Sequence, residues 1–341
     1  MPITTSSITG TITGNDFSID VTDEIIMQNG LSITMTTSDY SDLKIGTFNA
    51  AKMKLNIYDD DAAQHDFTDA LIVLTLHETD EDENTTDTDL GLYIVDSTLS
   101  SRKRNQVKLV AFDKAVNFDI VLSSSFKNTE FTPLTLLQTA CADIDVPLAD
   151  STNLSIFPNH DVTFKLTSNR VQSYRDAIIE TVRLMCANAV INRDGELEIR
   201  RARYDSGEDW LITGAERFTT EFSDTRTYIN WIRVLSEKKD YRASSSIVIT
   251  DPQARPAPYN VQCTLMDTET TGLAWLEYID SFMQRRVKTK ILSNVSIKLG
   301  DCIRFAGGEI DIRRSILAVV TGIVWQYKGY MEIQCAAPNS H

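Results

Sequence analysis

The sequence is poor in the residues that most often bind metals or carry out catalysis. Only four of its 341 residues are histidine and five are cysteine. The four histidines are far apart: His65, His77, His160 and His341. No two cysteines have the C-x-x-C spacing of a zinc or redox site, and most have apolar neighbours: Cys141, Cys186, Cys263, Cys302 and Cys335. We therefore expect no metal site and no histidine-based triad, and we expect the thiols to be buried and free.

Long apolar segments are also missing. No run of apolar residues is long enough to form a transmembrane helix. The first twenty residues, MPITTSSITGTITGNDFSID, contain neither the basic nor the apolar region of a secretory signal. The sequence therefore predicts a soluble protein made in a cytoplasm, with no membrane anchor.

Basic residues are also few relative to acidic ones. The chain carries 33 Lys and Arg against 48 Asp and Glu, for a net charge of −15. This balance opposes specific binding to nucleic acid or to anionic membranes, because both need clustered Lys and Arg. Hydrophobic residues make up 42% of the chain, which is enough for substantial cores. The length allows two or three domains.

Much of the acidity is local. Seven of the twelve residues 78–89, ETDEDENTTDTD, are Asp or Glu. The segment lacks the glycine and the spaced final glutamate of an EF-hand loop. We expect a solvated hairpin tip, with a cation site as the alternative. Asp59, Asp60 and Asp61 are interpreted in the same way, as a turn that ends a strand rather than as a ligand set.

The first third of the chain shows the alternation of β-strands. Apolar residues recur at every second position in residues 31–36 and 53–58. Residues 71–76, LIVLTL, are apolar on both faces, which indicates a buried strand. Further strands are predicted at 92–95 and 107–112. Short strands with polar gaps favour a closed or sandwiched antiparallel sheet.

The middle of the chain changes to an α+β pattern. A helix is predicted over 133–142 with Pro133 at its first position and with Leu134, Leu137, Ala140 and Cys141 on one face. A second helix begins after Ser173, which can form a capping box with Asp176. Its buried stripe is predicted to contain five residues: Tyr174, Ala177, Ile178, Val182 and Met185.

A hairpin follows this second helix directly. Val190 and Ile191 precede the turn Asn192-Arg193-Asp194-Gly195, and Leu197 and Ile199 follow it. We assign a conformational role to this turn and no chemistry.

The last third returns to β-structure. Strands are predicted at 227–235, where Tyr228, Trp231 and Val234 alternate only loosely and leave the register open, and at 244–250. Residues 251–258, DPQARPAP, are predicted to be a loop because they contain three prolines. A helix is predicted over 272–287, with Leu273, Leu276, Ile279, Phe282 and Met283 on one face. Further strands are predicted at four places, with tight turns at Gly300-Asp301 and Gly307-Gly308: 291–297, 301–305, 316–324 and 331–335.

This order predicts a mainly β fold with α+β insertions. Two antiparallel, tube-like β-barrels are expected to flank a small α+β module. The predicted domains are 1–125 for the first barrel, 126–217 for the helix-hairpin module and 218–341 for the second barrel, with a helix inserted near 272–287. The similar size of the two β parts suggests an internal duplication, although no repeated sequence is visible.

In this order, the chain resembles the baseplate or tail hub proteins of tailed bacteriophages, which include the phage Mu-like hub and the hub part of type VI spike proteins. Gly91–Asp96 with Val107–Asp113, Lys114 and Ala115 is similar to the strands that close the first hub barrel. Thr132–Leu148 is similar to the short helix after it. Ser173–Arg200 is similar to the helix-hairpin unit, and Leu299–Arg304 to the Gly-Asp turn and strand of the second barrel. The acidic insertion at 78–89 departs from the shared pattern.

The resemblance implies a structural virion protein. Hubs of this family are homotrimers, and two barrels in each subunit give a pseudo-sixfold ring between a sixfold tail tube and a threefold spike. The implied partners are two further copies, a tail tube or distal tail protein, a tape-measure protein and a spike protein. The chain ends just after the second barrel, so we expect any spike, peptidase or muramidase domain in another chain. The implied location is the virion tail, after synthesis in the host cytoplasm.

The resemblance also gives the net charge a use, because a ring in a tail must let DNA pass without binding it. We expect part of the negative charge to line this channel and repel phosphates. Two alternatives remain open at this stage. One is a tail-tip adhesin that binds a receptor or carbohydrate. The other is a cell-wall glycosidase that uses two carboxylates, although no pair of acids is singled out. We assign no catalytic, cofactor-binding or metal-binding residues, and expect no enzymatic activity.

Overall fold

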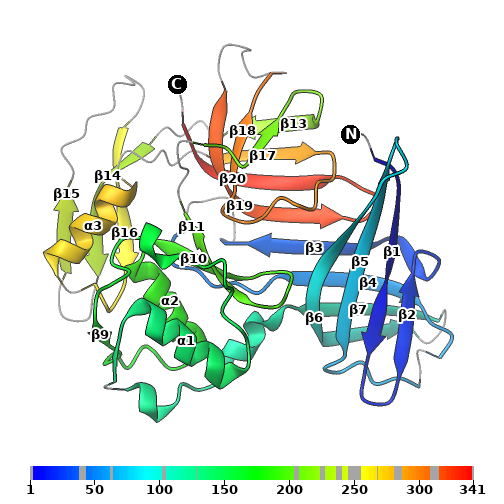
Figure 1. Cartoon of the computed structure of the whole chain (residues 1–341), viewed down its shortest axis with the longest axis horizontal. Coiled ribbons are helices and arrows are strands. Elements are labelled where there is room, and N and C mark those ends of the chain that lie inside the picture. The colour runs from blue at the N-terminus through cyan, green and yellow to red at the C-terminus, as the bar shows by residue number, and fades with distance from the viewer. Residues whose placement is uncertain are drawn as a thin grey trace.

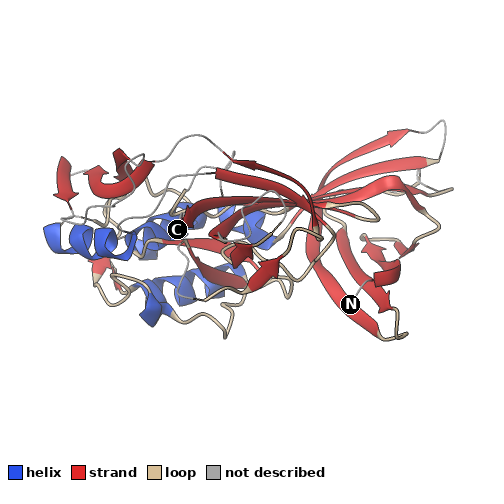
Figure 2. Cartoon of the chain, turned by 90° about the horizontal axis from the view of Figure 1, so that it is seen from above, coloured by secondary structure: helices blue, strands red, loops and turns tan. Residues whose placement is uncertain are grey.

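The computed structural model describes residues 3–37, 44–61, 64–101, 105–127, 129–202, 207–222, 227–235, 240–244, 255–266, 268–279, 286–307 and 315–339. The large sheet occupies one side of the molecule, and the helices lie on the other side together with the smaller sheets (Figures 1 and 2). In the part of the chain described, no helix is both long and apolar enough to span a membrane.

The N-terminal part forms seven strands that follow the order β3-β4-β7-β6-β5-β1-β2, all antiparallel. Their bounds are β1 (Ile3–Thr13), β2 (Ser18–Thr22), β3 (Ile26–Thr36), β4 (Lys52–Tyr58), β5 (Leu71–Asp80), β6 (Thr85–Ser101) and β7 (Gln106–Phe112). The strands predicted at 31–36, 53–58, 71–76, 92–95 and 107–112 are confirmed. Strand β5 is buried on one face only, since Leu71 is exposed.

The C-terminal part forms six strands of the same sheet. The four that continue its main path lie in the order β13-β17-β20-β19, and β18 pairs with both β19 and β12. Their bounds are β12 (Trp210–Ile212), β13 (Arg217–Phe222), β17 (Arg286–Ile291), β18 (Cys302–Phe305), β19 (Ile316–Gln326) and β20 (Met331–Asn339). The strand predicted at 291–297 is misplaced, because β17 ends at Ile291 and the chain turns at Asn294.

The two parts are one sheet, because β3 of the first pairs antiparallel with β19 of the second. Figure 1 shows β3 lying between β19 and β4. Thirteen strands are therefore continuous through both parts. This junction is not anticipated by the prediction of two separate barrels. Whether either part also closes as a barrel remains a prediction.

The two parts repeat the same topology. Strands β3, β4, β5, β6 and β7 of the first correspond to β13, β17, β18, β19 and β20 of the second. The spatial order β3-β4-β7-β6-β5 matches β13-β17-β20-β19-β18 strand for strand. The antiparallel pairings are also the same. The duplication that the similar sizes suggest is therefore present in the fold.

Backbone details repeat as well. The partner residues shift register between Val95 and Ser97 in β6, and between Val320 and Gly322 in β19. The Val95 N–H donates to the Ala70 carbonyl, and the Val320 N–H donates in the same way to the carbonyl of Asp301, at 2.9 Å in both parts. The preceding residues, Asp69 and Gly300, both have positive φ, at 58° and 82°. The two parts therefore follow one backbone plan with different side chains.

The helix-hairpin module follows the first part of the sheet. It contains α1 (Pro133–Ile144), α2 (Tyr174–Leu184), β10 (Ala187–Ile191), β11 (Leu197–Arg201), the short pair β8 (Glu130–Phe131) and β9 (Phe164–Lys165), and three 3-10 helices, η1 (Lys114–Asp119), η2 (Ser124–Phe126) and η3 (Leu154–Ile156). The capping box of Ser173 and Asp176 is confirmed, and the whole predicted stripe of α2 is buried. On α1, Leu134 is exposed and Leu136 is buried instead.

A second insertion lies between β13 and β17, where the first part has only the β3–β4 loop. It contains β14 (Thr227–Leu235), β15 (Asp240–Ser244), β16 (Arg255–Gln262) and α3 (Glu269–Ile279). The predicted loop at 251–258 is wrong for Arg255–Pro258, which open β16. Strand β16 is at the edge of its sheet, where proline is tolerated because one side needs no N–H donor.

Other predictions in this insertion are partly wrong. Helix α3 begins earlier than the predicted 272–287, and Val287 already belongs to β17. Leu273 is exposed, whereas Leu276 and Ile279 are buried. On β14, Trp231 is only half-buried. Residues 245–250, Gly308, Phe282 and Met283 lie outside the described part.

The apolar side chains form two cores. One lies between both halves of the large sheet, and the other joins the module to β14, β16 and α3. The predicted ranges 126–217 and 218–341 do not coincide with this packing. The reason is that Trp275 and its neighbours, although inserted in the second β part, pack on α2.

Candidate functional site

The junction between β3 and β19 holds the two halves of the sheet together. Five residue pairs run from Gly322 opposite Thr36 to Gln326 opposite Ser32. The Thr321 carbonyl accepts from the Thr37 N–H at 2.8 Å and from its hydroxyl at 3.1 Å. Ile33, Ile323 and Trp325 make one face of the junction buried, whereas the other face carries partly exposed side chains: Ser32, Thr34, Thr36, Val324 and Gln326. The junction is therefore a strand pairing supported by a core on one side.

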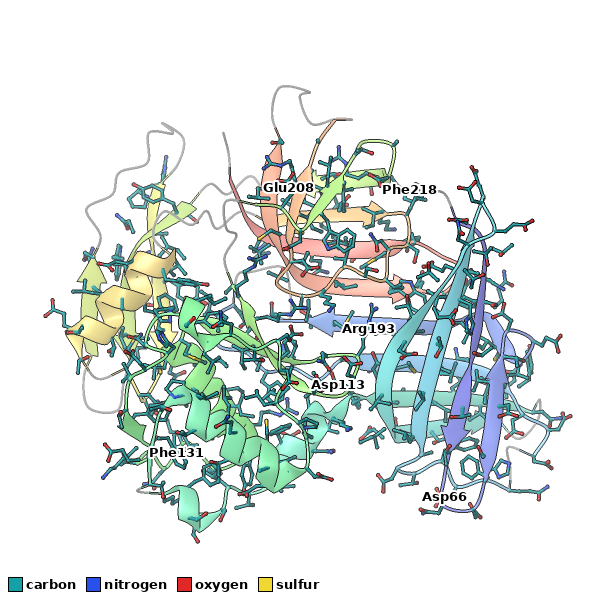
Figure 3. All side chains as sticks on the ribbon, in the orientation of Figure 1. Asp66, Asp113, Phe131, Arg193, Glu208 and Phe218 are labelled. Atoms are coloured by element: carbon teal, nitrogen blue, oxygen red, sulfur yellow. The ribbon has the colours of Figure 1, made fainter. Side chains whose placement is uncertain are left out.

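The tip of the β10–β11 hairpin meets this sheet near the junction. Gly195 has a φ of 78°, and a Cβ there would lie 2.8 Å from Leu92. Arg193 donates to the carbonyl of Val295, in the loop before β18. Figure 3 shows Arg193 and Asp113 where the hairpin reaches the sheet. The predicted turn therefore has a packing role that joins the module to both halves.

Asp113 is a buried acid in this region. Its two carboxylate oxygens accept from the N–H groups of Ala51 at 2.9 Å and Ala115 at 3.0 Å. Burial raises the pKa of Asp113 to about 7, although these hydrogen bonds and the charge of Arg175 oppose the shift. Burial also raises the pKa of Tyr93, with a further contribution from Asp113.

Asp113 should make stability depend on pH. Between its ordinary pKa of 3.8 and about 7, the folded protein holds a proton that the unfolded chain has released. The free energy of unfolding therefore falls as the pH rises through this window. Asparagine cannot ionise, so the stability of the wild type relative to Asp113→Asn should fall by about 2 kcal/mol between about pH 5 and 6.5. Urea denaturation at several pH values measures this difference.

A buried amide provides the control. The Asn188 side chain accepts from the N–H and hydroxyl of Thr47, both at 3.0 Å, and it does not ionise. Asn188→Ala should therefore lower stability by a similar amount at every pH. A difference between wild type and Asp113→Asn that stays constant across the window would contradict the assignment.

Arg175 ties α2 to the first part of the sheet. Its guanidinium donates to the Phe48 carbonyl at 2.5 Å and to the Ala115 carbonyl at 2.7 Å, and it pairs with Asp119. It also lies over the Phe48 ring, 5.2 Å from the centroid. The planar fork of arginine suits such several-point contact. Arg175 and Arg193 therefore attach the helix-hairpin module to the rest of the protein at two separate points.

Strand edges in both halves of the sheet carry no partner among the described residues. Strand β5 pairs with β6 only as far as Ile94, so the outer edge of residues 96–101 is open. At the other end of the sheet, β13 pairs with β17 on one side only. Its Phe218 is 62% exposed, and Figure 3 shows it on that outer strand. Such edges are templates for pairing with another chain.

A groove of about 540 Å³ lies between the two halves, near β1, β12 and β13. Its lining includes the carboxylates Glu78 and Glu216 and the aromatic residues Trp210, Trp325 and Tyr327. Burial raises the pKa of Glu78. The Glu216 carboxylate accepts from the Thr213 N–H at 2.7 Å and from its hydroxyl at 2.8 Å. No local sequence pattern indicates this grouping, because its residues come from segments that are far apart in the chain.

The other sequence expectations concern metals and thiols. Residues 81–84 form an exposed turn between β5 and β6, and the remaining acidic segment continues those strands. No group of His, Cys, Asp and Glu suited to a metal ion occurs within the described ranges. All five cysteines are buried, as predicted, and none of them forms a disulfide.

Comparison with known proteins gives structural matches. No family model matches the chain, and no curated protein matches its sequence. The tail protein from Neisseria meningitidis MC58 is similar, with a TM-score of 0.62 at 10% identity, over 97% of this chain and 96% of that one. The 43 kDa tail protein of prophage MuSo2 from Shewanella oneidensis has a TM-score of 0.58 at 9% identity, over 97% and 96%. Prophage tail protein gp18 from Listeria monocytogenes EGD-e has a TM-score of 0.57 at 10% identity, over 97% and 94%.

These matches extend over nearly the whole chain, through both halves of the sheet and the module between them. At identities of 9% and 10%, the similarity lies in the fold and not in the side chains. The predicted resemblance is confirmed at that level: the chain has the fold of phage tail proteins, in line with the hub-like family that its sequence pattern resembles.

Proposed function

We propose that this chain is a structural subunit of a phage tail, the hub of a baseplate or tail tip. Three copies form a ring that joins a sixfold tail tube to a threefold spike and lets DNA pass. Its partners are two further copies, a tail tube or distal tail protein, a tape-measure protein and a spike protein. Its role is assembly, with no enzymatic step.

The observation that carries this proposal is the repeated β unit inside one chain. Two units with the same strand order are joined head to tail through β3 and β19. A head-to-tail contact that is repeated with a suitable rotation closes into a ring. Three chains with two units each supply six similar units, which suits an adaptor between sixfold and threefold symmetry. Its likeness to phage tail proteins supports the same role.

The charge expected for the channel wall is revised. On β4, β7, β13, β17 and β20 the solvent face of the sheet carries six basic and two acidic side chains: Lys52, Lys54, Lys108, Arg286, Lys288, Lys290, Glu221 and Glu332. The junction strands between them carry no charged side chain on this face, which is formed by Ser32, Thr34, Thr36, Gly322, Val324 and Gln326. If this face lines the ring, the expected acidic wall is replaced by a mixed polar wall with spaced lysines. The acidic segment 78–89 belongs to the β5–β6 hairpin of the same sheet.

The mass in solution tests the proposal. We expect light scattering after size-exclusion chromatography to give three times the 38.3 kDa of one chain, because the ring closes at three copies. The fraction of trimer should rise with protein concentration. A stable dimer, or a monomer at every concentration up to the solubility limit, would contradict the ring.

One observation favours a second candidate. The groove that holds Glu78 and Glu216 beside aromatic side chains is where a cell-wall glycosidase would act. Zymography on host cell wall tests it. Lysis by the wild type that Glu78→Gln abolishes would support the enzyme, whereas clearing that is absent or unchanged in the variant would exclude this groove.

A further inference from the structure

We propose that the open edge of β6, residues 96–101, pairs antiparallel with β13 of a second copy of this chain. The inference rests on the proposed ring and identifies its subunit interface. Each edge thus binds another copy of the chain. The contact is expected to follow the β3–β19 pairing inside the chain.

The internal junction sets the pattern. Strand β19 has two segments on either side of an irregularity at Thr321. The segment before it, residues 316–319, pairs with β18, and the segment after it, residues 322–326, pairs with β3. Strand β6 is divided in the same way at Asp96. The segment before it pairs with β5, but the segment after it has β7 as its only partner among the described strands.

The repeat makes residues 97–101 the counterpart of 322–326. Ser97 corresponds to Gly322, because each is the first residue after the irregularity and pairs with Val110 or Gln334 of the next strand. Ser101 then corresponds to Gln326. The open edge of β6 is therefore the edge that, in the second half, binds β3.

The strand that should occupy this edge follows from the same correspondence. Strand β3 pairs Ser32 with Lys54 of β4, and β13 pairs Glu221 with Lys288 of β17. Lys54 and Lys288 correspond, since they pair with Val110 and Gln334 respectively. Glu221 is therefore the counterpart of Ser32, and β13 is the counterpart of β3.

The register of the interface follows. Inside the chain, Ser32 lies opposite Gln326. Between copies, Glu221 of one should lie opposite Ser101 of the next. Glu221 is exposed, so the surface at this position is open for contact. Each chain offers one β6 edge and one β13 edge, so the contact is heterologous and can propagate until the ring closes.

The other end of the sheet offers a competing edge. Strand β2 is the terminal strand of the pairing path, and Asp20 on it is exposed. A pairing of β2 with β13 would also join copies head to tail. Strand β2 has no counterpart at the internal junction, so the repeat favours β6.

Disulfide trapping distinguishes the two edges. The variant Glu221→Cys with Ser101→Cys places one thiol on each proposed edge, and the five native thiols are buried. Mild oxidation of the full chain should give covalent dimers and a covalent trimer on non-reducing gels. The two single variants should give at most a dimer between like positions. The matched control is Glu221→Cys with Asp20→Cys, which should give no trimer.

Mass measurements on the same samples separate the outcomes. A protein that is trimeric by light scattering but cross-links only through Asp20→Cys, or through neither pair, overturns the β6–β13 interface and leaves the ring intact. A protein that stays monomeric and uncross-linked overturns both. Trimer formation through Ser101 and Glu221, with at least a tenfold excess over the control pair, is the expected result.

Discussion

Trp325→Ala should lower the free energy of unfolding by about 4 kcal/mol, because it removes a large buried side chain from the junction of the two halves. Trp325 is 3% exposed and lies on β19 opposite Ile33 of β3. Its indole N–H donates to the Ser293 hydroxyl at 2.7 Å. The variant loses this hydrogen bond and leaves a cavity beside the groove. Urea denaturation followed by circular dichroism measures the loss.

A second tryptophan gives a matched control. Trp231 on β14 is half-buried, and the Arg242 guanidinium lies over its ring, 3.9 Å from the centroid. Trp231→Ala should cost about 1 kcal/mol, since a cation–π contact on a partly exposed ring contributes little. Equal losses for the two variants would show that the junction is not a principal support of the sheet.

Local signals predicted the helix-hairpin module well. The capping box of Ser173 and Asp176, the stripe of α2 and the Asp194-Gly195 turn depend on residues at most a few positions apart. Such patterns reflect local backbone preferences, and the tertiary structure does not override them in this module. The helix after Thr132 is correct for the same reason, because Pro133 fits its first position.

Errors arose where tertiary position decides. Leu134 fits the predicted stripe of α1, but it is exposed. Helix α1 packs with Leu136 in the core instead. The prolines of β16 indicated a loop because the sequence does not show that this strand is at an edge. The strand expected at 291–297 is displaced, because the helix predicted over 272–287 extends into residues that begin β17.

The junction could not be predicted from the sequence. Strands β3 and β19 are separated by almost the whole chain, and no local pattern selects one partner over another. The repeat is equally hidden, because corresponding positions share burial and not identity. Met53 and Val287 are both buried, and so are Leu55 and Thr289. The groove and its two carboxylates could not be predicted for the same reason, since their segments meet only in the folded sheet.

The inserted segment that carries α3 should be as important for the module as the junction is for the sheet. Trp275 is fully buried, and its indole N–H donates to the Arg183 carbonyl at the end of α2 at 2.8 Å. Its ring packs on Tyr259 of β16, with 5.5 Å between the centroids. One side chain thus connects α2, β16 and α3.

We expect Trp275→Ala to lower the unfolding free energy by about 4 kcal/mol, through the cavity and the lost contacts. Trp275→Phe keeps most of the packing but leaves the Arg183 carbonyl without this donor, so it should cost about 1 to 2 kcal/mol. Leu273→Ala, at an exposed position of the same helix, should cost less than about 0.5 kcal/mol. Urea titrations of the three variants give the comparison, and hydrogen exchange should show the Trp275→Ala loss first in α2 and α3. A cost for Trp275→Ala no larger than that for Leu273→Ala would mean that the insertion is attached by other contacts.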